Sequence, residues 1–468
     1  MAYPLEPDRD EMRAIADRAV SFVIDFISAL PEAPASDLEG YEDAISRIQS
    51  GAPEAGTSFP ELVDQVALGA AKAFNPASPG YLAFIPGGGL FAAAIADFMS
   101  LSVNRFMNLW NPAPVFAAME NDVIRWLCGA FGYPDGARGI LTSGGSISNF
   151  SALVTARTAK LPENFLDGCI YVTDQTHASV AKAAGLAGFP ARALRSVPVT
   201  PELRMDAGEL DRMIKEDRAA GRSPFCVVAS AGTTNTGAVD PIADVADLCE
   251  TEGLWLHADA AYGGFFGLTE RGRALFDGIA RADSITLDPH KALFLPYGTG
   301  VLLVRNGEQL REAHRAKGEY LQDLAPEGDI PNFADYSPEL SRDFRGLRVW
   351  LPLKLHGLAA FRAALDEKLD LTRVLYEALK ATPGFDVPWL PELTVVPFRY
   401  VPASGDVDEF NRRLLERINA SKRVFLSSTR LNGDFWIRAC IVSHRTHRDR
   451  IDEAIEIILD AARALDHP

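Results

Sequence analysis

The sequence contains few cysteines, and none of them forms a pair at a metal-binding spacing. Only five of the 468 residues are cysteine, and no Cys-x-x-Cys motif occurs. This odd, low number is typical of a protein from a reducing compartment. It also excludes the usual zinc-binding spacings, so we expect no metal site of that kind.

Long uninterrupted apolar runs are also missing. The longest candidate, LAFIPGGGLFAAAIADFM over residues 82–99, is broken by Pro86 and three glycines and carries Asp97. A membrane-spanning helix needs about 20 consecutive apolar residues, so no span is predicted. The start, MAYPLEPDRDEMRAI, lacks the basic and apolar regions of a signal peptide. The expected location is therefore the cytoplasm.

Positively charged residues are fewer than negatively charged ones. Lysine and arginine number 46 against 63 aspartates and glutamates, which gives a net charge of −17. This balance argues against a nucleic acid or an anionic membrane as partner. The length leaves room for two to four domains, or for one large catalytic domain with additions.

Helical periodicity marks the N-terminal region. It runs over residues 8–30, with Asp8 able to cap the start, and again over residues 59–74. These helices precede the main sheet and could form a partner-binding arm.

From about residue 137 the pattern changes to short apolar runs that alternate with helical stretches. Buried parallel strands with helical crossovers produce this alternation. The strand runs are GILTSG, CIYVTD, FCVVASAG, LWLHADA, SITLDP and GVLLVR. After Trp350 a helical stretch, the strand runs LTVVPFRYV and FWIRACIVS, and a final helix from about Arg448 predict a small α+β domain. We expect an α/β fold with three parts, residues 1–89, 90–348 and 349–468.

Residues able to do chemistry follow five of these strand runs. They are a Gly-Ser turn with Ser146 and Ser148, then His177, then Thr233 and Thr234, then Asp259 with Ala261, and finally His290 with Lys291. Each signal alone has an ordinary explanation: a tight turn, a hydrogen-bonded histidine, a loop cap, a buried carboxylate cap, or a lysine at the surface. In open α/β sheets, ligands bind outside the carboxyl ends of the strands. Five such coincidences at one edge favour a shared site.

Together these residue types meet the needs of pyridoxal 5′-phosphate. A lysine forms the Schiff base with this cofactor. A carboxylate keeps its pyridine nitrogen protonated, so that the ring accepts electrons, and a small side chain packs flat against the ring. A helix N-terminus takes the phosphate.

The strings HADAAYGG and DPHK, at residues 257–264 and 288–291, resemble the fold-type I pyridoxal-phosphate decarboxylases. The resemblance is to the group that contains the aromatic-L-amino-acid, glutamate and histidine decarboxylases. It extends from SPGYLAFIPGG through FRGLRVW to the C-terminal domain, nearly the whole chain. Many members have Asn-Pro-His-Lys where this chain has Asp288. That acid adds a possible negative charge beside the cofactor, which should modulate the chemistry without abolishing it.

The resemblance implies a role for each residue at the five strand ends. Lys291 would be the Schiff-base lysine, and Asp259 would pair with the pyridine nitrogen. His177 would stack on the ring face opposite Ala261. Thr234 would lie near the cofactor and the substrate carboxylate. The residues implied to hold the phosphate are Ser146, Ile147, Ser148 and His290.

A long polar segment matches the family's mobile catalytic loop, at about residues 315–340. Its Tyr320 aligns with the tyrosine that reprotonates the α-carbon after carbon dioxide leaves. Relatives with phenylalanine there tend to be oxidative aldehyde synthases. Tyr320 therefore favours simple decarboxylation of an L-amino acid to its amine.

The side-chain pocket that the resemblance implies is apolar and aromatic, which favours tryptophan, phenylalanine, tyrosine or DOPA as substrate. Asn108 departs from this pattern, because aromatic relatives usually have an aromatic residue there. APVFAAME, at residues 113–120, is similar to the glutamate-type relatives, so an acidic or small polar substrate stays open. The predicted pocket residues are Tyr81, Phe84, Ile85, Pro86, Phe106, Asn108 and Trp110.

Two further alternatives stay open. One is a different fold-type I reaction, such as aldehyde synthesis, carbon–carbon lyase chemistry or transamination. The other is a non-catalytic relative, which would require the loss of site residues, and none is visibly lost. Because family members of this kind are obligate homodimers with sites at the interface, the resemblance also implies a homodimer.

Overall fold

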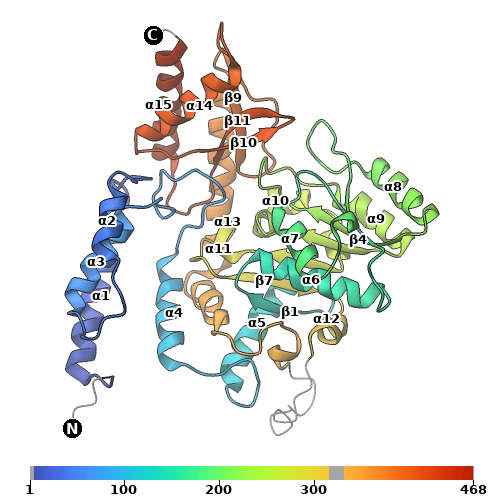
Figure 1. Cartoon of the computed structure of the whole chain (residues 1–468), viewed down its shortest axis with the longest axis horizontal. Helices are drawn as coiled ribbons and strands as arrows, with labels where there is room; N and C mark the ends of the chain where they lie inside the picture. Colours follow the sequence, from blue (N-terminus) through green and yellow to red (C-terminus); the bar gives the residue numbers. More distant parts are fainter. Residues whose placement is uncertain (1–4, 316–330, 467–468) are drawn as a thin grey trace.

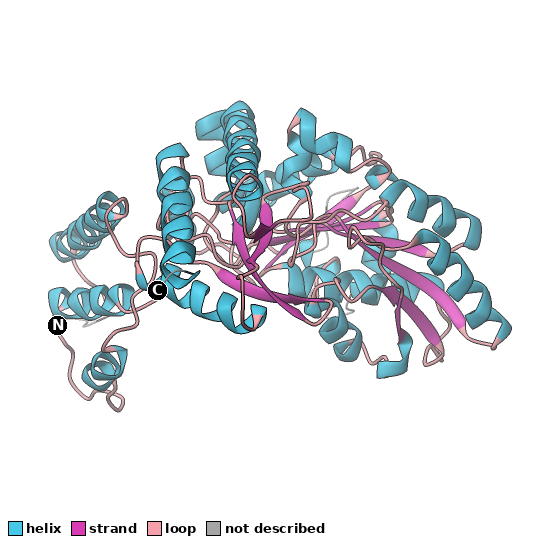
Figure 2. Ribbon diagram, turned by 90° about the horizontal axis from the view of Figure 1, so that it is seen from above, coloured by secondary structure: helices cyan, strands magenta, loops and turns pink. Residues whose placement is uncertain are grey.

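A seven-stranded sheet forms the centre of the molecule, and helices cover both of its faces (Figures 1 and 2). The computed structural model describes residues 5–315 and 331–466, so Tyr320 lies outside the described residues. The strand order is β1-β7-β6-β5-β4-β2-β3. Strand β7 is antiparallel to both of its neighbours, and the pairs from β6 to β3 are parallel. This mostly parallel α/β sheet confirms the predicted fold class. The strands are β1 (Arg138–Thr142), β2 (Gly168–Val172), β3 (Leu194–Ser196), β4 (Ser223–Ser230), β5 (Trp255–Asp259), β6 (Ser284–Leu287) and β7 (Gly300–Val304).

The central strands are apolar because both of their faces are buried. In β5, Leu256 packs into the core on one face of the sheet and Trp255 into the core on the other. Side chains alternate along a strand, so His257 and Asp259 share the face of Trp255. Helix α6 (Gly145–Lys160) packs on that face. The carboxyl end of β5 therefore presents Asp259 to the start of α6.

The remaining helices of the large domain alternate with the strands along the chain and lie beside the sheet (Figure 1). Helices α4 and α5 precede the first strand. Their bounds are α4 (Phe91–Val103), α5 (Pro114–Ala130), α7 (Ala178–Leu186), α8 (Ala207–Ala219), α9 (Ile242–Glu252), α10 (Glu270–Leu275), α11 (Pro289–Ala292) and α12 (Gly307–His314).

A second, four-stranded antiparallel sheet builds the C-terminal part, in the order β10-β11-β9-β8. The predicted strands β9 and β11 and the final helix are confirmed, whereas β8, β10 and α14 were not predicted. Helix α13 runs across the expected boundary at 348–349 and contains a break at Gly357, with φ 73°. The three-part division of the chain stays a prediction. The elements are α13 (Arg345–Lys380), β8 (Phe385–Asp386), β9 (Val395–Tyr400), α14 (Val407–Ala420), β10 (Ser427–Leu431), β11 (Asp434–Cys440) and α15 (Arg448–Asp466).

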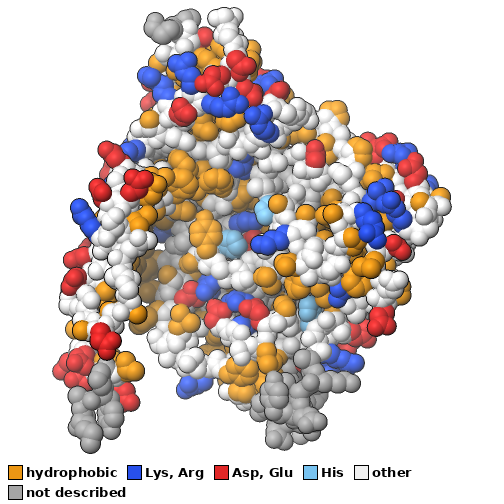
Figure 3. Space-filling model, viewed as in Figure 1, with side chains coloured by type: hydrophobic (Ala, Val, Ile, Leu, Met, Phe, Trp, Pro, Cys, Tyr) orange, Lys and Arg blue, Asp and Glu red, His pale blue; other side chains and the backbone are white. Residues whose placement is uncertain are grey.

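The N-terminal helices α1 (Arg9–Ala29), α2 (Tyr41–Ile48) and α3 (Phe59–Ala71) form an arm along one side of the molecule (Figure 1). Asp8 begins α1 with a capping box, as its sequence predicted. No side chain of α1 is buried within the described chain. Figure 3 shows a recess between this arm and the body, with hydrophobic side chains along it. None of the described helices combines the length and the apolar character needed to cross a membrane.

A buried ion pair joins α5 to the start of α13. The side chains of Glu120 and Arg342 are both 0% exposed, and the Gly346 N–H also donates to Glu120 Oε2 at 3.1 Å. We expect Glu120→Gln to lower the free energy of unfolding by about 3 kcal/mol, because it leaves the arginine charge unpaired in the core. Urea unfolding measures this.

The matched control for Glu120 is Asp460, whose partner Arg463 is as exposed as it is (73% and 72%). We expect no measurable change for Asp460→Asn, because exposed pairs contribute little. Equal urea midpoints for the wild type and Glu120→Gln would contradict the importance of the buried pair.

Candidate active site

A cavity of about 380 Å³ opens at the carboxyl ends of the parallel strands. It collects residues from all five of the predicted strand ends, which lie far apart in the sequence. Its lining includes Gly144, Gly145, Ser146, Ile147, Asn149, His177, Thr233, Thr234, Asp259, Ala261, Asp288, His290 and Lys291. The expectation of one shared site at this edge of the sheet is therefore met.

Lys291 lies in the short helix α11, directly after β6. Pro289 begins this helix, where its missing N–H costs no hydrogen bond. The Lys291 side chain is 18% exposed, and its Nζ lies 3.0 Å from Asp288 Oδ2. A buried lysine needs such a partner. This contact with Asp288 was not predicted.

Asp259 is held by neutral groups. Its Oδ2 accepts a hydrogen bond from Asn149 Nδ2 at 3.0 Å, and its Oδ1 accepts one from the Ala261 N–H at 3.2 Å. Hydrogen bonds from neutral donors favour the charged form of a carboxylate, but they do not compensate its negative charge as a cation would. Asp259 is therefore ready to face a cationic group in the cavity.

A chain of hydrogen bonds behind Asp259 fixes its orientation. Burial lowers the pKa of His257 to about 4, against an opposing effect of Asp259, so the ring is neutral at pH 7. His257 Nε2 lies 3.0 Å from Asn149 Oδ1, and His257 Nδ1 lies 2.8 Å from Ser284 Oγ. Asn149 Oδ1 can only accept, so His257 Nε2–H donates to it. Nδ1 of the neutral ring then accepts from the Ser284 hydroxyl, whose oxygen accepts from Trp255 Nε1. Every donor in this chain is directed toward the Asp259 carboxylate.

His177 is the N-cap of helix α7 and is connected to the same hydrogen-bond network. Its Nδ1 accepts from the Ser179 N–H at 3.2 Å and lies 2.8 Å from Ser179 Oγ. Asn149 Nδ2 in turn donates to Ser179 Oγ at 3.0 Å. These bonds hold the ring of His177 at the cavity, where it was predicted to stack on a cofactor.

The glycine–serine turn ends at the start of α6. Gly144 has φ 153°, a conformation that favours glycine, and a Cβ on Gly145 would lie 3.0 Å from Asp288 Oδ2. The first N–H groups of a helix have no intrahelical acceptor, so this turn can bind an anion. Ser146 and Ile147 line the cavity. Ser148 instead lies buried, with its Oγ 2.8 Å from Thr142 Oγ1, and braces the turn from behind.

His290 stands between the turn and Lys291. Its Nδ1 lies 2.6 Å from the carbonyl oxygen of Thr299 and donates to it. Burial lowers the pKa of His290, although Asp288 acts in the opposite direction. The ring is therefore a neutral hydrogen-bonding group at the cavity.

Comparison with known proteins assigns the chain to a family. The model of the pyridoxal-dependent decarboxylase conserved domain matches residues 42–401. The chain belongs to the pyridoxal-dependent decarboxylase family. It is 38% identical to an aromatic-L-amino-acid decarboxylase of Bacillus atrophaeus, over 98% of this chain and 96% of that one. As the family implies, it is a pyridoxal-phosphate-dependent carboxy-lyase.

Two solved structures of pyridoxal-phosphate decarboxylases share the whole fold. A structure of Oryza sativa TDC with PLP and tryptamine superposes with a TM-score of 0.95 and 26% identity, covering 100% of both chains. Catharanthus roseus tryptophan decarboxylase in complex with L-tryptophan gives a TM-score of 0.91 and 26% identity, covering 99% of this chain and 100% of that one. The fold-type I architecture predicted from the sequence is thereby confirmed.

The residues of this decarboxylase site fit pyridoxal phosphate. The turn at Gly144 offers N–H groups to a phosphate, and Asp259 can face a protonated ring nitrogen without losing its own partners. The Lys291 side chain, with its Nζ at the cavity, can supply the amine that the cofactor's aldehyde requires. Asp288 is the exception, because it puts a second carboxylate close to the turn at Gly144 and Gly145.

Thr234 is held at the decarboxylase site by a buried arginine that was not predicted. Arg438 in β11 is 3% exposed and donates to the Thr234 carbonyl at 2.6 Å and to the Phe84 carbonyl at 3.1 Å. It also donates to Ser427 Oγ at 3.0 Å and to the Asn235 carbonyl at 3.3 Å. This guanidinium therefore joins the loop after β4 to the C-terminal sheet.

The predicted substrate residues lie outside the cavity that the described chain forms. Tyr81 is buried and stacks on Phe425 at 5.6 Å. Phe84 and Phe106 are exposed (52% and 38%), and Ile85 and Pro86 are buried. Their assignment to a pocket was implied by the family resemblance, which does not give the neighbours that each side chain contacts in this chain.

Asn108 and Trp110 hold the last part of the segment that was expected to form the catalytic loop, residues 332–340. Asn108 Nδ2 donates to the carbonyls of Glu339 and Leu340, both at 2.9 Å. The Trp110 N–H donates to Asn332 Oδ1 at 2.9 Å. Asn108 is fully buried within the described chain, and its hydrogen bonds support this segment.

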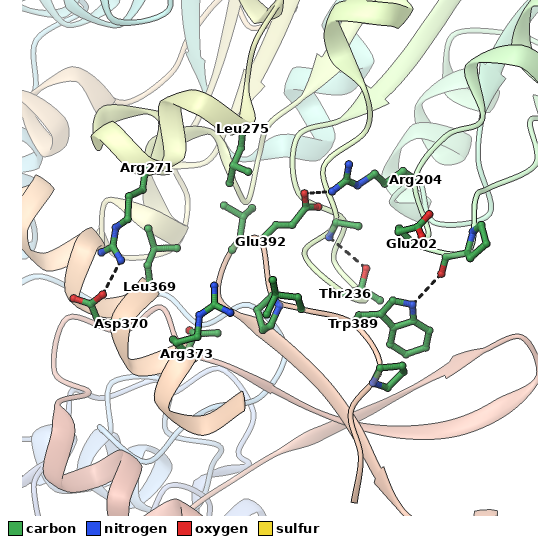
Figure 4. Close-up of a pocket in the computed structure, with 17 residues that line it drawn as sticks. Glu202, Arg204, Thr236, Arg271, Leu275, Leu369, Asp370, Arg373, Trp389 and Glu392 are labelled. Atoms are coloured by element: carbon green, nitrogen blue, oxygen red, sulfur yellow. Dashed lines mark hydrogen bonds and ion pairs between the residues drawn. The ribbon is translucent and has the colours of Figure 1, made fainter. Parts of the chain in front are cut away.

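A larger cavity, of about 820 Å³, opens between the large domain and the C-terminal part (Figure 4). Most of its charged side chains form ion pairs with each other: Arg271 pairs with Asp370 at 2.6 Å, and Arg204 pairs with Glu392. Trp389 Nε1 donates to the Pro201 carbonyl at 3.0 Å. Neither lysine nor histidine lines it. The smaller cavity, which contains both residue types, is therefore the candidate active site.

Proposed function

We propose that this enzyme removes the carboxyl group of an aromatic L-amino acid and releases the amine and carbon dioxide. The observation that carries the proposal is the similarity to an aromatic-L-amino-acid decarboxylase over 98% of the chain. It is supported by a cavity in which a lysine, a carboxylate and a helix start converge. Tryptophan, phenylalanine, tyrosine and DOPA are the proposed substrates.

In this proposal each cavity residue has a separate role. Lys291 forms the covalent link to the cofactor, Asp259 faces the pyridine nitrogen, and His177 and Ala261 pack on opposite faces of the ring. Ser146 and Ile147, with His290, bind the phosphate, while Ser148 supports their turn through Thr142. Thr234 contacts the substrate carboxylate. Pyridoxal phosphate, when bound, supplies an electron-accepting ring.

The reaction then depends on the charge of Asp259, on the exclusion of water and on a proton donor. The Asn149 and Ala261 donors hold the Asp259 carboxylate in place, so its charge stabilises a ring proton without reorganisation. Excluding water from the substrate carboxylate favours loss of neutral carbon dioxide. Tyr320 is the proposed donor of the proton that the α-carbon then takes up.

We expect Tyr320→Phe to divert the reaction from amine toward aldehyde. Removing the hydroxyl removes the proposed proton donor, and relatives with phenylalanine there tend to be aldehyde synthases. Product analysis for amine, aldehyde and ammonia measures the change. Tyr376→Phe is the control, because that tyrosine lies in the second half of α13, against the core of the C-terminal part, and has no proposed role in the proton transfer. An unchanged amine yield for Tyr320→Phe would remove Tyr320 from the mechanism.

The test of the proposed function is a substrate panel. Aromatic, acidic and small polar L-amino acids are supplied to the cofactor-loaded enzyme, and carbon dioxide, amine, aldehyde and ammonia are measured. We expect aromatic amino acids to give amine and carbon dioxide in equal amounts. Turnover restricted to glutamate, aspartate or another polar amino acid would overturn the aromatic assignment.

A polar substrate has less support than the sequence suggested. Asn108 was the residue that favoured it, but its Nδ2 donates to the carbonyls of Glu339 and Leu340. Its Oδ1 has no hydrogen-bond partner among the described residues, but it is buried and does not line the cavity. In APVFAAME, Glu120 is buried against Arg342 and does not line the cavity. Neither polar residue is therefore free to contact a substrate in the described chain.

We further propose that the enzyme works as a homodimer. The arm helix α1 buries none of its side chains, and α4 exposes Phe98 and Leu101 (61% and 64%). Such apolar surface is typical of an interface. Phe84 and Phe106 then belong to a pocket completed by the second copy. Light scattering tests this: a monomeric, active enzyme would contradict it.

The cytoplasm is the proposed location. All five cysteines are free and buried, which suits a reducing compartment. Neither a nucleic acid nor a membrane is proposed as partner.

A further inference from the structure

Asn149, in helix α6, makes hydrogen bonds to three other polar side chains beside the candidate active site. It lines the cavity and is 1% exposed. Its Nδ2 donates to Asp259 Oδ2 and to Ser179 Oγ, both at 3.0 Å. Its Oδ1 lies 3.0 Å from His257 Nε2 and accepts from it. Both hydrogens and the oxygen of this buried amide therefore have partners.

Asn149 connects two side chains that belong to different elements of the site. Asp259 ends β5, and His177 is the N-cap of α7. Asp259 accepts directly from the amide, whereas the connection to His177 runs through Ser179, whose Oγ lies 2.8 Å from His177 Nδ1. Because Ser179 Oγ accepts from Asn149, the hydroxyl hydrogen is available to donate to His177 Nδ1. One amide group thus supports both side chains.

The carboxylate of Asp259 sets the orientation of the Asn149 amide. A charged carboxylate can only accept, so the amide must turn its Nδ2 toward Asp259 and its Oδ1 toward His257. His257 must then carry its hydrogen on Nε2. This agrees with the effect of burial, which lowers the pKa of His257 to about 4 and leaves the ring neutral at pH 7. A neutral His257 therefore supports the amide from behind.

Without Asn149, each of the two connected side chains would keep one hydrogen bond. Asp259 Oδ1 would still accept from the Ala261 N–H at 3.2 Å, and His177 Nδ1 would still accept from the Ser179 N–H at 3.2 Å. A side chain with a single remaining hydrogen bond can reach other rotamers more easily. The loss of Asn149 should therefore change the positions of both side chains more than it changes the backbone.

We propose that Asn149 is a positioning residue that holds Asp259 and His177 at fixed positions relative to each other, with His257 supporting its amide. Asn149 acts through these two side chains, which are the groups proposed to face the ring nitrogen and one ring face of the cofactor. The inference rests on the proposed function for those two roles. A misplacement of about 1 Å can lower a catalysed rate by on the order of 100-fold.

The first test needs neither cofactor nor substrate. Crystal structures of the apo wild type and of Asn149→Ala are compared at the side chains of Asp259 and His177. We expect both side chains to move by about 1 Å or to occupy more than one rotamer in the variant, because each has lost a hydrogen-bonded support. A wild-type position for either side chain overturns the proposal, which requires Asn149 to hold both.

The second test follows the ring of the bound cofactor. Visible circular dichroism of the cofactor-loaded enzyme reports the orientation of the ring, and steady-state kinetics with the best substrate of the panel report the rate. We expect Asn149→Ala to lose intensity in the visible band and to lower kcat by about tenfold or more, with substrate KM changed by less than about threefold. An unchanged visible band, wild-type kcat or a loss confined to KM overturns the proposal.

Asn411 in α14 is the matched control for the loss of a buried asparagine. It is 0% exposed and also makes three side-chain hydrogen bonds, each at 2.8 Å. Its Oδ1 accepts from the Tyr400 N–H, and its Nδ2 donates to the carbonyls of Tyr400 and Val407. None of these residues lines the cavity. We expect Asn411→Ala to lower the urea midpoint, as Asn149→Ala does, and to leave the visible band and kcat unchanged. Equal losses of band and kcat in the two variants would point to general destabilisation and overturn the proposal.

The role of His257 has its own test. His257→Leu removes the donor to Asn149 Oδ1, whereas His257→Gln keeps an N–H group that can donate to it. We expect His257→Leu to lower kcat and His257→Gln to restore most of that loss. The double variant of Asn149→Ala with His257→Leu should lose little more than Asn149→Ala alone, because the histidine acts through the amide. Additive losses, or no rescue by glutamine, overturn the supporting role of His257.

The inference and the proposed function fail separately. A substrate panel without turnover would count against the proposed function, and the apo crystal structures would still decide whether Asn149 holds Asp259 and His177. Wild-type positions of these side chains in apo Asn149→Ala would count against the inference, whatever amino acid the enzyme decarboxylates.

Discussion

Lys291→Ala abolishes the visible absorbance of the lysine-linked cofactor and lowers decarboxylation by on the order of 10⁴-fold or more. The expectation follows from the position of its Nζ in the cavity, beside Asp288 and at the end of β6. Without the amine, the covalent link to the aldehyde cannot form. Absorbance after dialysis and a carbon dioxide assay measure the two effects.

Two control proteins separate chemistry from folding. Lys182→Ala removes an exposed lysine from α7 and should leave absorbance and rate unchanged. Lys291→Ala also leaves Asp288 unpaired, so the double variant with Asp288→Asn tests whether that charge disturbs the fold. A lysine-linked absorbance that survives dialysis in Lys291→Ala would show that another lysine anchors the cofactor.

The second large effect is expected for Asp259→Asn, which should lower kcat by on the order of 100-fold or more. The substitution keeps the shape of the side chain and removes the charge that faces the proposed ring nitrogen. Substrate KM should change much less, because the carboxylate contacts the cofactor rather than the substrate. Steady-state kinetics with an aromatic substrate measure both constants.

The cofactor spectrum gives an independent readout for Asp259→Asn. A ring nitrogen without its carboxylate loses its proton more easily, so the absorbance should become pH-dependent where that of the wild type is flat. Asp244→Asn, on the exposed side of α9, is the control and should behave as the wild type. If Asp259→Asn retains wild-type kcat, the proposed role of this carboxylate is wrong.

The sequence was most informative where local pattern and site chemistry coincide. Buried strands are apolar along their length, so β1, β2, β4, β5, β6 and β7 could be predicted, together with the residues at their carboxyl ends. Strand β3 is only three residues long and carries no period of its own. Strand β10, with Ser427, Thr429 and Arg430, is too polar to stand out.

Contacts across the chain could not be predicted. Asn149 and His257 are 108 residues apart, and only the fold brings α6 onto β5 so that they meet. The alternation of β5 did carry a signal, since His257 lies two residues before Asp259 and shares its face. Tyr81 and Phe106 were predicted as pocket residues from the family resemblance, which does not give the neighbour that a side chain contacts in this chain.

Arg438 has a consequence for exchanging parts between relatives. Its guanidinium links β11 to the Thr234 carbonyl and the Phe84 carbonyl, so three segments from distant parts of the gene share one anchor. A chimera that takes its C-terminal region from another protein must bring an arginine to this position and meet the same two carbonyls. Without that match, the graft would shift a wall of the catalytic cavity even if every residue of the cavity were retained.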